Sequence, residues 1–225
     1  MAIPSFEPVT LAIQGESSRF PVRRVFCVGR NYAEHAREMG HDPDREPPFF
    51  FGKDAEALSQ ESTLPYPSLT EDVHHEVELV VALAAGGRDL KAEDVRSAIY
   101  GYAVGIDYTR RDMQSVAKKL ARPWFLSKSF IGAAPITPLI PAATLGHPRE
   151  GRIWLEVEGA VRQDGNLNQM IWGIEETVAI LSTYDELLPG DLVFTGTPAG
   201  VGPVARGQAV RAGVDGVATL EMRFT

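Results

Sequence analysis

The sequence has very little cysteine and no long apolar run. Its one cysteine, Cys27, cannot form a disulfide within the chain, and no thiolate cluster can bind zinc or an iron–sulfur centre. The longest uninterrupted apolar run covers residues 79–85, far short of the roughly 20 residues that a membrane-spanning helix needs. The N-terminus has no cationic stretch followed by an apolar one. We therefore expect a cytoplasmic protein in which oxygen and nitrogen atoms are the ligands of any bound metal.

Basic residues are also in the minority. Lysine and arginine together number 22 against 30 aspartates and glutamates, which gives a formal net charge of −8. Such a surface repels a phosphate backbone or an anionic membrane over most of its area, so we expect neither a nucleic-acid partner nor a membrane partner. Hydrophobic residues make up 44% of the 225 residues. That share is enough to bury a core and excludes a disordered or fibrous chain.

Prolines and glycines interrupt the chain often enough to predict many short elements, and this pattern favours an α+β fold that is rich in strands. Strands are expected at residues 9–13, 24–28, 74–84, 100–106, 153–158, 208–212 and 217–224. Helices are expected at residues 31–39, 91–98, 109–120 and 174–183.

No change of composition and no linker divides the chain. We therefore expect a single domain over residues 21–225, with residues 1–20 as an N-terminal extension or a first strand. Residues 40–48 are polar, charged and proline-bearing, which predicts an exposed loop and makes this segment a candidate lid.

Two glutamates stand two positions apart on the clearest expected strand. Because side chains alternate along a strand, Glu76 and Glu78 project from the same face, with about 7 Å between their α-carbons. Taken alone, such a pair most often belongs to a solvated face. Here the apolar neighbours predict a buried strand, where two carboxylates repel each other unless a cation or a proton compensates them.

A third carboxylate, Asp107, follows the next expected strand. Three oxygen ligands without cysteine or paired histidine favour a hard cation, Mg²⁺ or Mn²⁺ before Zn²⁺, with Ca²⁺ as a further alternative. His35 and Glu38 lie three residues apart in an expected helix, so they share a face. A histidine that a carboxylate orients can act as a general base near neutral pH. The alternative for this pair is an ordinary surface contact.

Polar residues after Asp107 are candidates for binding an anionic substrate. Arg111, Gln114 and Lys128 follow it, and cations beside a metal can bind a carboxylate despite the negative net charge; a structural role is the alternative for each. The glycine-rich run at residues 195–202 is neither a Walker loop nor a dinucleotide fingerprint. Close backbone approach to a small ligand and a plain tight turn both remain open for it.

Together these segments resemble the fumarylacetoacetate hydrolase family, in particular its short, single-domain branch that includes fumarylpyruvate hydrolases and acylpyruvases. The resemblance spans roughly residues 24–225, in the family's order. The matching motifs are GRNYAEHARE at 29–38, HEVEL at 75–79, GID at 105–107 with Arg-Asp at 111–112, LSKSF at 126–130 and TGTPAGVG at 195–202.

The resemblance implies a fold, an assembly and a site. The fold implied is a mixed β-sandwich roll, and members are usually homodimers. Metal binding falls to Glu76, Glu78 and Asp107, a water-activating dyad to His35 and Glu38, a charge partner beside the metal to Lys128, and substrate contacts to Arg111, Gln114 and Thr197. At residues 51–54 this chain runs Phe-Gly-Lys-Asp, where many relatives continue from lysine into proline, so we expect a different local turn there.

The activity that the resemblance implies is hydrolysis of the carbon–carbon bond of a 2,4-dioxo acid such as fumarylpyruvate, which yields fumarate and pyruvate in aromatic catabolism. In that mechanism a metal chelates the substrate, His35 activates water and Lys128 stabilises the developing oxyanion. One alternative is oxaloacetate decarboxylation, or isomerisation and decarboxylation of related dioxo acids, at the same metal site. Another is a non-catalytic domain in which the ion only stabilises the fold.

Overall fold

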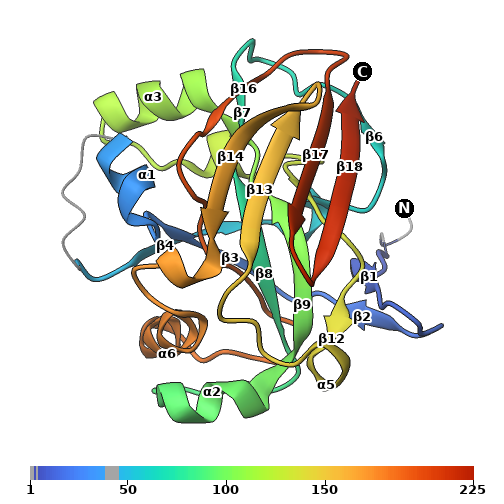
Figure 1. Cartoon of the computed structure of the whole chain (residues 1–225), viewed down its shortest axis with the longest axis vertical. Coiled ribbons are helices and arrows are strands. Elements are labelled where there is room, and N and C mark those ends of the chain that lie inside the picture. Colours follow the sequence, from blue (N-terminus) through green and yellow to red (C-terminus); the bar gives the residue numbers. More distant parts are fainter. Residues whose placement is uncertain (1–2, 4, 39–45) are drawn as a thin grey trace.

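The computed structural model describes residues 3, 5–38 and 46–225 of the chain. Two β-sheets pack face to face and form the body of the molecule (Figure 1). The larger sheet has the strand order β12-β9-β8-β15-β3-β4, with bounds β3 (Val25–Gly29), β4 (Phe49–Lys53), β8 (Val77–Leu83), β9 (Ile99–Ile106), β12 (Ile140–Pro141) and β15 (Leu192–Phe194). The second sheet has the order β14-β13-β17-β18-β6, with bounds β6 (Thr63–Leu64), β13 (Arg152–Val157), β14 (Ala160–Asn166), β17 (Ala209–Val214) and β18 (Ala218–Phe224).

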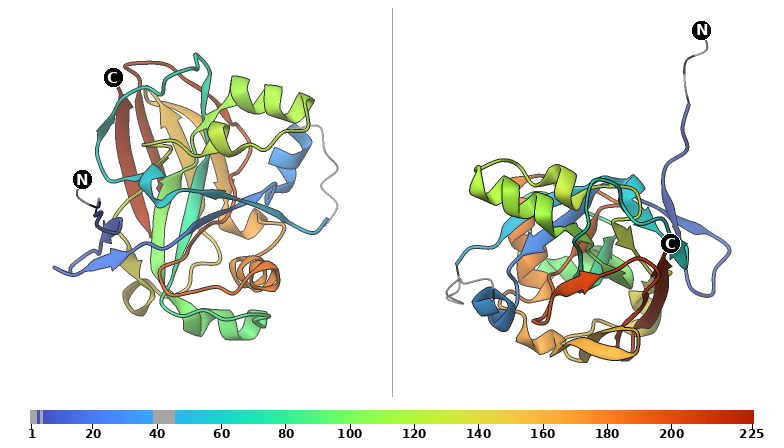
Figure 2. Two further views of the ribbon diagram at one scale, coloured as in Figure 1. Left: turned by 180° about the vertical axis from the view of Figure 1, so that it is seen from behind. Right: turned by 90° about the horizontal axis from the view of Figure 1, so that it is seen from above.

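Three small sheets extend this body: β1 (Thr10–Ala12) with β2 (Arg19–Pro21), β5 (Leu58–Ser59) with β11 (Ala134–Pro135), and β7 (Val73–His75) between β10 (Thr109–Arg110) and β16 (Gly202–Val204). The α-helices are α1 (Ala33–Glu38), α2 (Ala92–Ala98), α3 (Arg111–Lys119), α4 (Phe125–Lys128), α5 (Ala142–Leu145) and α6 (Ile174–Tyr184). Short 3-10 helices cover Ala55–Ala57 and Leu167–Gln169. Helices α1 and α3 lie toward one end of the sheets, and α2 and α6 toward the other (Figure 2).

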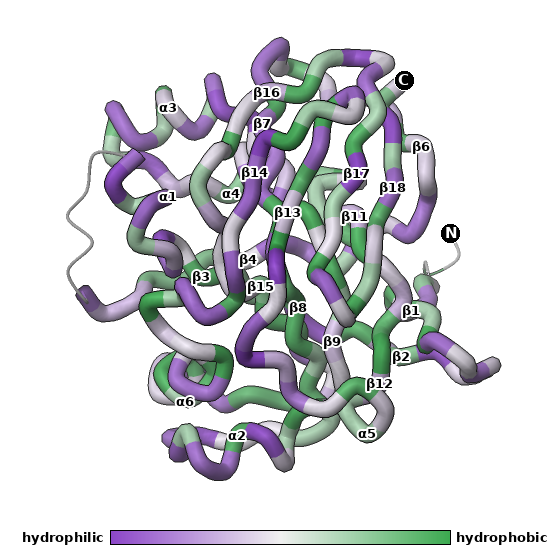
Figure 3. The backbone as a smooth tube through the Cα atoms, viewed as in Figure 1, coloured by the Kyte–Doolittle hydropathy of each residue, from purple (hydrophilic) through white to green (hydrophobic). Residues whose placement is uncertain are grey.

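The alternation expected along β8 divides the core in two. Val77, Leu79, Val81 and Leu83 all join the core between the two large sheets, whereas Val80 and Ala82 join a second core on the opposite face. All seven residues of β8 are buried, and the strand is hydrophobic along most of its length (Figure 3). A side chain such as Glu78 is therefore placed in an apolar setting by a strand that is covered on both faces.

The fold agrees with the strand-rich prediction, and most expected elements are present within one or two residues of their expected ends. Cys27 is fully buried in β3. Within the described residues, no helix is both long and apolar enough to cross a membrane. The candidate lid at 40–48 falls largely on residues 40–45, which lie outside the described residues, so that hypothesis stays a prediction.

Two local predictions were wrong, and one strand was missed. The strand expected over 74–84 is interrupted at Glu76, because β7 pairs with β10 and β16 whereas β8 pairs with β9 and β15. The helix expected over 109–120 begins only at Arg111, because the two preceding residues pair with β7. Strand β4 was not expected, although its run of three phenylalanines is typical of a strand.

Candidate active site

Three carboxylates lie close together at one edge of the larger sheet, where β8 begins and β9 ends. Glu76 lies at the junction of β7 and β8, Glu78 is in β8, and Asp107 follows β9 directly. The Asp107 amide donates to the Glu76 carbonyl oxygen at 2.8 Å, which fixes the two strand ends side by side. One carboxylate oxygen from each residue lies within 4.8 Å of the other two. We call these three residues the acidic cluster; they are 6%, 2% and 0% exposed.

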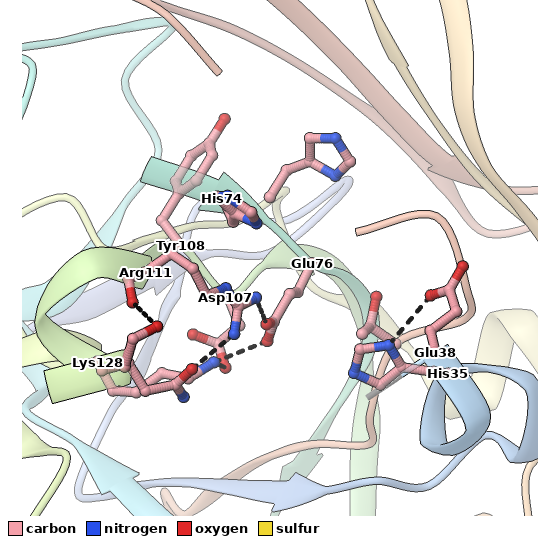
Figure 4. Close-up of polar contacts among 12 residues, drawn as sticks. His35, Glu38, His74, Glu76, Asp107, Tyr108, Arg111 and Lys128 are labelled. Carbon is pink, nitrogen blue, oxygen red and sulfur yellow. Dashed lines mark hydrogen bonds and ion pairs between the residues drawn. The ribbon is translucent and has the colours of Figure 1, made fainter. Parts of the chain in front are cut away.

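Two cations neutralise one half of the acidic cluster. Lys128 Nζ lies 2.7 Å from Glu76 Oε2 and 2.7 Å from Asp107 Oδ2, and Arg111 Nη2 lies 2.5 Å from Glu76 Oε1 (Figure 4). Burial alone would raise the pKa of Glu76, but the charges of Lys128 and Arg111 outweigh it and hold that pKa well below its usual range. Burial would lower the pKa of Lys128, yet Asp107 and Glu76 raise it above its ordinary value. Glu76 and Lys128 therefore remain ionised at neutral pH.

Glu78 is in the opposite situation. Its Oε2 accepts a hydrogen bond from the Gly196 amide at 2.6 Å, and no cationic side chain forms an ion pair with it among the described residues. Burial, followed by the charges of Asp107 and Glu76, raises the pKa of Glu78 well above its ordinary value. The acidic cluster thus lacks positive charge at Glu78. Three converging hard oxygen donors, one of them without a neighbouring positive charge, fit a divalent cation, Mg²⁺ or Mn²⁺.

Lys53 belongs to the site but was missed by the sequence analysis. It ends β4, its side chain is fully buried, and its Nζ lies 2.7 Å from Asp107 Oδ1. It also donates to the carbonyl oxygen of Lys128 and, at 3.3 Å, to that of Tyr108. The signal available was a lysine at the end of an aromatic strand, in the one segment where the family resemblance weakens. The next residue, Asp54, stands where many relatives have proline, and its backbone amide donates to Ser129 Oγ at 2.9 Å.

The pair expected as a dyad occupies α1. His35 is 8% exposed, and its Nδ1 lies 3.7 Å from Glu38 Oε2, a contact longer than a hydrogen bond. Burial lowers the pKa of His35, although the charges of Glu76 and Glu38 oppose that effect. The imidazole is therefore neutral at pH 7 and able to accept a proton. The Glu38 side chain is 45% exposed, so this half of the site borders solvent.

A small pocket, with a volume of about 50 Å³, unites most of the predicted residues. His35, Glu76, Glu78, Arg111, Gln114, Lys128 and Thr197 all line it. The pocket also has aromatic walls that the sequence analysis did not predict, formed by Phe49, Phe51 and Trp124. Gln114 Oε1 accepts a hydrogen bond from Arg111 Nη1 at 2.6 Å, which orients the guanidinium toward Glu76.

The glycine-rich run connects the two halves of the site. The Gly196 amide binds Glu78, and the Gly200 amide donates to both oxygens of Glu38 at 3.0 Å. Gly196 has φ +96°, and a Cβ there would lie 2.7 Å from the Cβ of Asn31, so a larger residue is excluded. The amides of these two glycines thus bind protein carboxylates. Asn31, also missed, holds the start of the run by donating to the Thr195 carbonyl oxygen at 2.8 Å.

The sequence matches the fumarylacetoacetate hydrolase C-terminal family over residues 24–225. Fumarylpyruvate hydrolase from Pseudomonas aeruginosa, crystallised in complex with Mn²⁺ and pyruvate, is 50% identical and superimposes with a TM-score of 0.96, covering 100% of this chain and 99% of that chain. This likeness confirms the predicted mixed β-sandwich roll.

Two sequence relatives have different activities in their names. An oxaloacetate tautomerase from Escherichia coli (strain K12) is 41% identical over 204 residues, which are 90% of this chain and 93% of the relative. A mitochondrial oxaloacetate decarboxylase from Dictyostelium discoideum is 39% identical over 204 residues, with the same coverage of 90% and 93%. Each relative is matched over nearly its whole length.

Proposed function

This chain belongs to the fumarylacetoacetate hydrolase family, and we propose that it is a divalent-metal-dependent hydrolase that cleaves the carbon–carbon bond of a 2,4-dioxo acid. The preferred substrate in this proposal is fumarylpyruvate, with fumarate and pyruvate as products. The observation that supports it most is a buried, neutral His35 that lines the same pocket as Glu76 and Glu78 of the acidic cluster. A structural metal ion would need no such base beside it.

The charges of the site favour a dianionic substrate. Three cations, Lys53, Lys128 and Arg111, match the three carboxylates in number, but among the described residues they pair only with Glu76 and Asp107 and not with Glu78. A divalent cation adds two positive charges to this buried site. A dicarboxylate such as fumarylpyruvate or oxaloacetate restores neutrality on binding, whereas a neutral ligand does not.

The residues of this chain account for a hydrolytic step. When bound at the acidic cluster, a divalent cation would orient the substrate and act as a Lewis acid on its oxygens. His35 takes a proton from water through Nε2, because Nδ1 faces Glu38, and the hydroxide attacks the 4-oxo carbon. The bond between carbons 3 and 4 then breaks, and the pyruvate half leaves with the electron pair and gains a proton. Glu38 orients the imidazole and stabilises its charged form.

Lys128 has one more donor to contribute. Two of its three N–H groups bind Glu76 and Asp107, and within the part of the chain that the structure describes no hydrogen-bond acceptor contacts the third. In this proposal that third group donates to the oxyanion that forms at carbon 4. In this proposal Arg111 and Gln114 bind the substrate through the groups they present to the pocket. Trp124, Phe49 and Phe51 also line the pocket, and in this proposal they exclude water.

A second candidate is tautomerisation or decarboxylation of oxaloacetate, which the tautomerase and decarboxylase relatives favour. Decarboxylation requires no attacking water, so it needs the acidic cluster but not the dyad. Hydrolysis and decarboxylation therefore differ in their dependence on His35, whereas tautomerisation, a proton transfer, can use the same base.

The experiment that tests the proposal measures three substrates with and without Mg²⁺ or Mn²⁺. Cleavage of fumarylpyruvate or acetylpyruvate removes the enol absorbance and produces one pyruvate per turnover. Tautomerisation removes the enol absorbance of oxaloacetate without pyruvate, and decarboxylation produces pyruvate from oxaloacetate. A metal-loaded enzyme that acts on oxaloacetate and leaves both acylpyruvates intact would contradict the hydrolase. Assembly as a homodimer and a cytoplasmic location stay predictions, and sedimentation equilibrium tests the first.

A further inference from the structure

The strand β14 of the second sheet is pressed against the glycine-rich run that borders the pocket. A Cβ at Gly200 would lie 2.0 Å from the carbonyl oxygen of Arg162, and a Cβ at Gly165 would lie 2.8 Å from the Cβ of Pro198. Between these two close approaches, Gln163 is fully buried and directs its amide at the run. A buried amide in such a position must satisfy all of its hydrogen-bonding groups within the protein.

Backbone partners fix which end of the Gln163 amide is oxygen. Its Oε1 accepts from the backbone N–H of Val77 at 3.1 Å, and its Nε2 donates to the carbonyl oxygen of Pro198 at 2.9 Å. A backbone N–H can only donate and a carbonyl oxygen can only accept, so the amide cannot be flipped. His75 Nδ1, 3.0 Å from the same Oε1, is therefore a donor as well.

This orientation determines the direction of the Thr197 hydroxyl. Gln163 Nε2 lies 2.8 Å from Thr197 Oγ1 and must donate to it, so Thr197 accepts at that contact and its own proton points elsewhere. Thr197 is 3% exposed and lines the same pocket as Glu76 and Glu78. Among the residues that the structure describes, no acceptor is bonded to that hydroxyl. The remaining direction for its proton is the pocket.

We propose that Gln163 is a positioning residue that turns the Thr197 hydroxyl into a fixed hydrogen-bond donor toward a carboxylate oxygen of the substrate. The proposal rests on the proposed function, because it assumes a 2-oxo acid anion in the pocket. It adds a reason why an amide from the other sheet is buried beside the site. Gln163, which is not among the residues that line the pocket, thus determines that Thr197 acts as a donor.

The test is a double-mutant cycle on acetylpyruvate hydrolysis, or on oxaloacetate turnover if that is the activity of the wild type. Thr197→Val removes the donor, and we expect KM to rise about 10- to 100-fold, the loss of one hydrogen bond to a charged group, with kcat changed less than about threefold. Thr197→Ser retains the hydroxyl and restores most of the KM. Gln163→Met, which keeps the length of the side chain, raises KM when it is the only substitution. When Thr197→Val is already present, the same change raises KM by less than about twofold.

A second variant covers the case in which Gln163→Met does not fold. Gln163→Glu keeps an oxygen for the Val77 amide but places an acceptor at Thr197, which then must donate to the protein, so KM rises as in Thr197→Val. Matched controls are Thr137→Val, a buried hydroxyl that accepts from the Val104 amide at 3.0 Å, and Gln208→Met, whose side chain accepts from Ala205. Both controls leave KM unchanged.

The outcomes separate this inference from the proposed function. The positioning role is wrong, although the enzyme turns over, if Gln163 variants raise KM by the same factor with Thr197→Val as without it. It is also wrong if they lower kcat and leave KM unchanged. If the wild type turns over neither substrate, the proposed function fails, and binding of pyruvate to the Mn²⁺-loaded protein by calorimetry replaces KM as the readout of the same cycle. A wild type that does not bind pyruvate overturns both.

Discussion

The two halves of the site are built in different ways. The acidic cluster rests on the ends of β8 and β9, is nearly inaccessible to solvent, and is fixed by three ion pairs of 2.7 Å or less to Lys128 and Arg111. The dyad rests on the six-residue helix α1, its acid is 45% exposed, and its two partners are 3.7 Å apart. One half is rigid before any ligand binds, and the other has room to tighten around a substrate.

Under the proposed function, the two halves have different roles. A metal site built from buried like charges needs a frame that prevents the carboxylates from moving apart, which paired strands provide. A general base needs access to water and a contact that shortens as charge develops, which a short helix at the edge of a pocket provides. Substitutions in the first half should therefore affect folding and metal binding, and those in the second half should affect turnover.

The largest effect is expected from Asp107→Asn. This substitution leaves Lys53 and Lys128, whose side chains are 0% and 3% exposed, without the carboxylate that pairs with both. Breaking a buried ion pair from one side costs about 3–5 kcal/mol, so urea denaturation of the metal-free protein should report a loss of that order. Glu38→Gln, at an exposed residue, should change stability by less than about 0.5 kcal/mol. Equal losses for the two variants would remove the distinction between the halves.

The next effect is on catalysis alone. His35→Ala should lower kcat/KM for acylpyruvate cleavage by about 10²- to 10⁴-fold, the contribution of a general base, and should leave the Kd for Mn²⁺ unchanged in calorimetry. Glu34→Gln is the matched control, since Glu34 lies on the same helix with a side chain that is 70% exposed. Retained cleavage by the His35 variant would exclude this residue as the base. Retained oxaloacetate decarboxylation by the His35 variant would not exclude His35 as the base, because that reaction uses no attacking water.

Metal binding should have a smaller and separable effect on stability. At a Mn²⁺ concentration of 100 times Kd, ligand linkage stabilises the fold by about 2.7 kcal/mol, which for a domain of this size raises Tm by about 5–10 °C. Glu78→Gln should abolish that rise. It should not lower the Tm of the metal-free protein, because burial and the neighbouring carboxylates already raise the pKa of Glu78. The exposed Glu221→Gln serves as control; an unchanged Mn²⁺ response in Glu78→Gln would contradict the metal site.

The smallest effect concerns pH. Burial lowers the pKa of His35 below its ordinary value of about 6.5, against the charges of Glu76 and Glu38. The base form is present above that pKa, so log kcat/KM should be flat near pH 7 and should fall as pH drops through a value below 6.5. Glu38→Gln removes a charge that raises this pKa, so the acid limb should move to lower pH. A limb that moves to higher pH would mean that another group titrates.

Sequence patterns were sufficient for the acidic cluster. The period of two along β8 placed Glu76 and Glu78 together, and the end of the next strand supplied Asp107, since both signals are local. The break at Glu76 was missed because it depends on β7 pairing with β10 and β16, which come from distant parts of the chain. Periodicity describes one strand at a time and cannot report which sheet a strand joins.

The supporting residues could not be found in the same way. Lys53 contacts Asp107 only because β4 pairs with β3 at the far edge of the sheet, and Gln163 reaches Thr197 from the other sheet. Neither residue stands in a pattern with its partner. The glycines of the run were noticed, but whether their amides bind a ligand or protein carboxylates depends on the tertiary positions of Glu38 and Glu78.

The central claim is that Glu76, Glu78 and Asp107 bind one divalent cation in front of His35. Anomalous diffraction from crystals grown with Mn²⁺ tests this claim most directly. We expect a single strong anomalous peak within about 2.0–2.6 Å of one oxygen from each of the three carboxylates, with the His35 ring facing its open side. Diffraction without a peak there, with the Lys128 ammonium between Glu76 and Asp107 as the only cation, would contradict the claim.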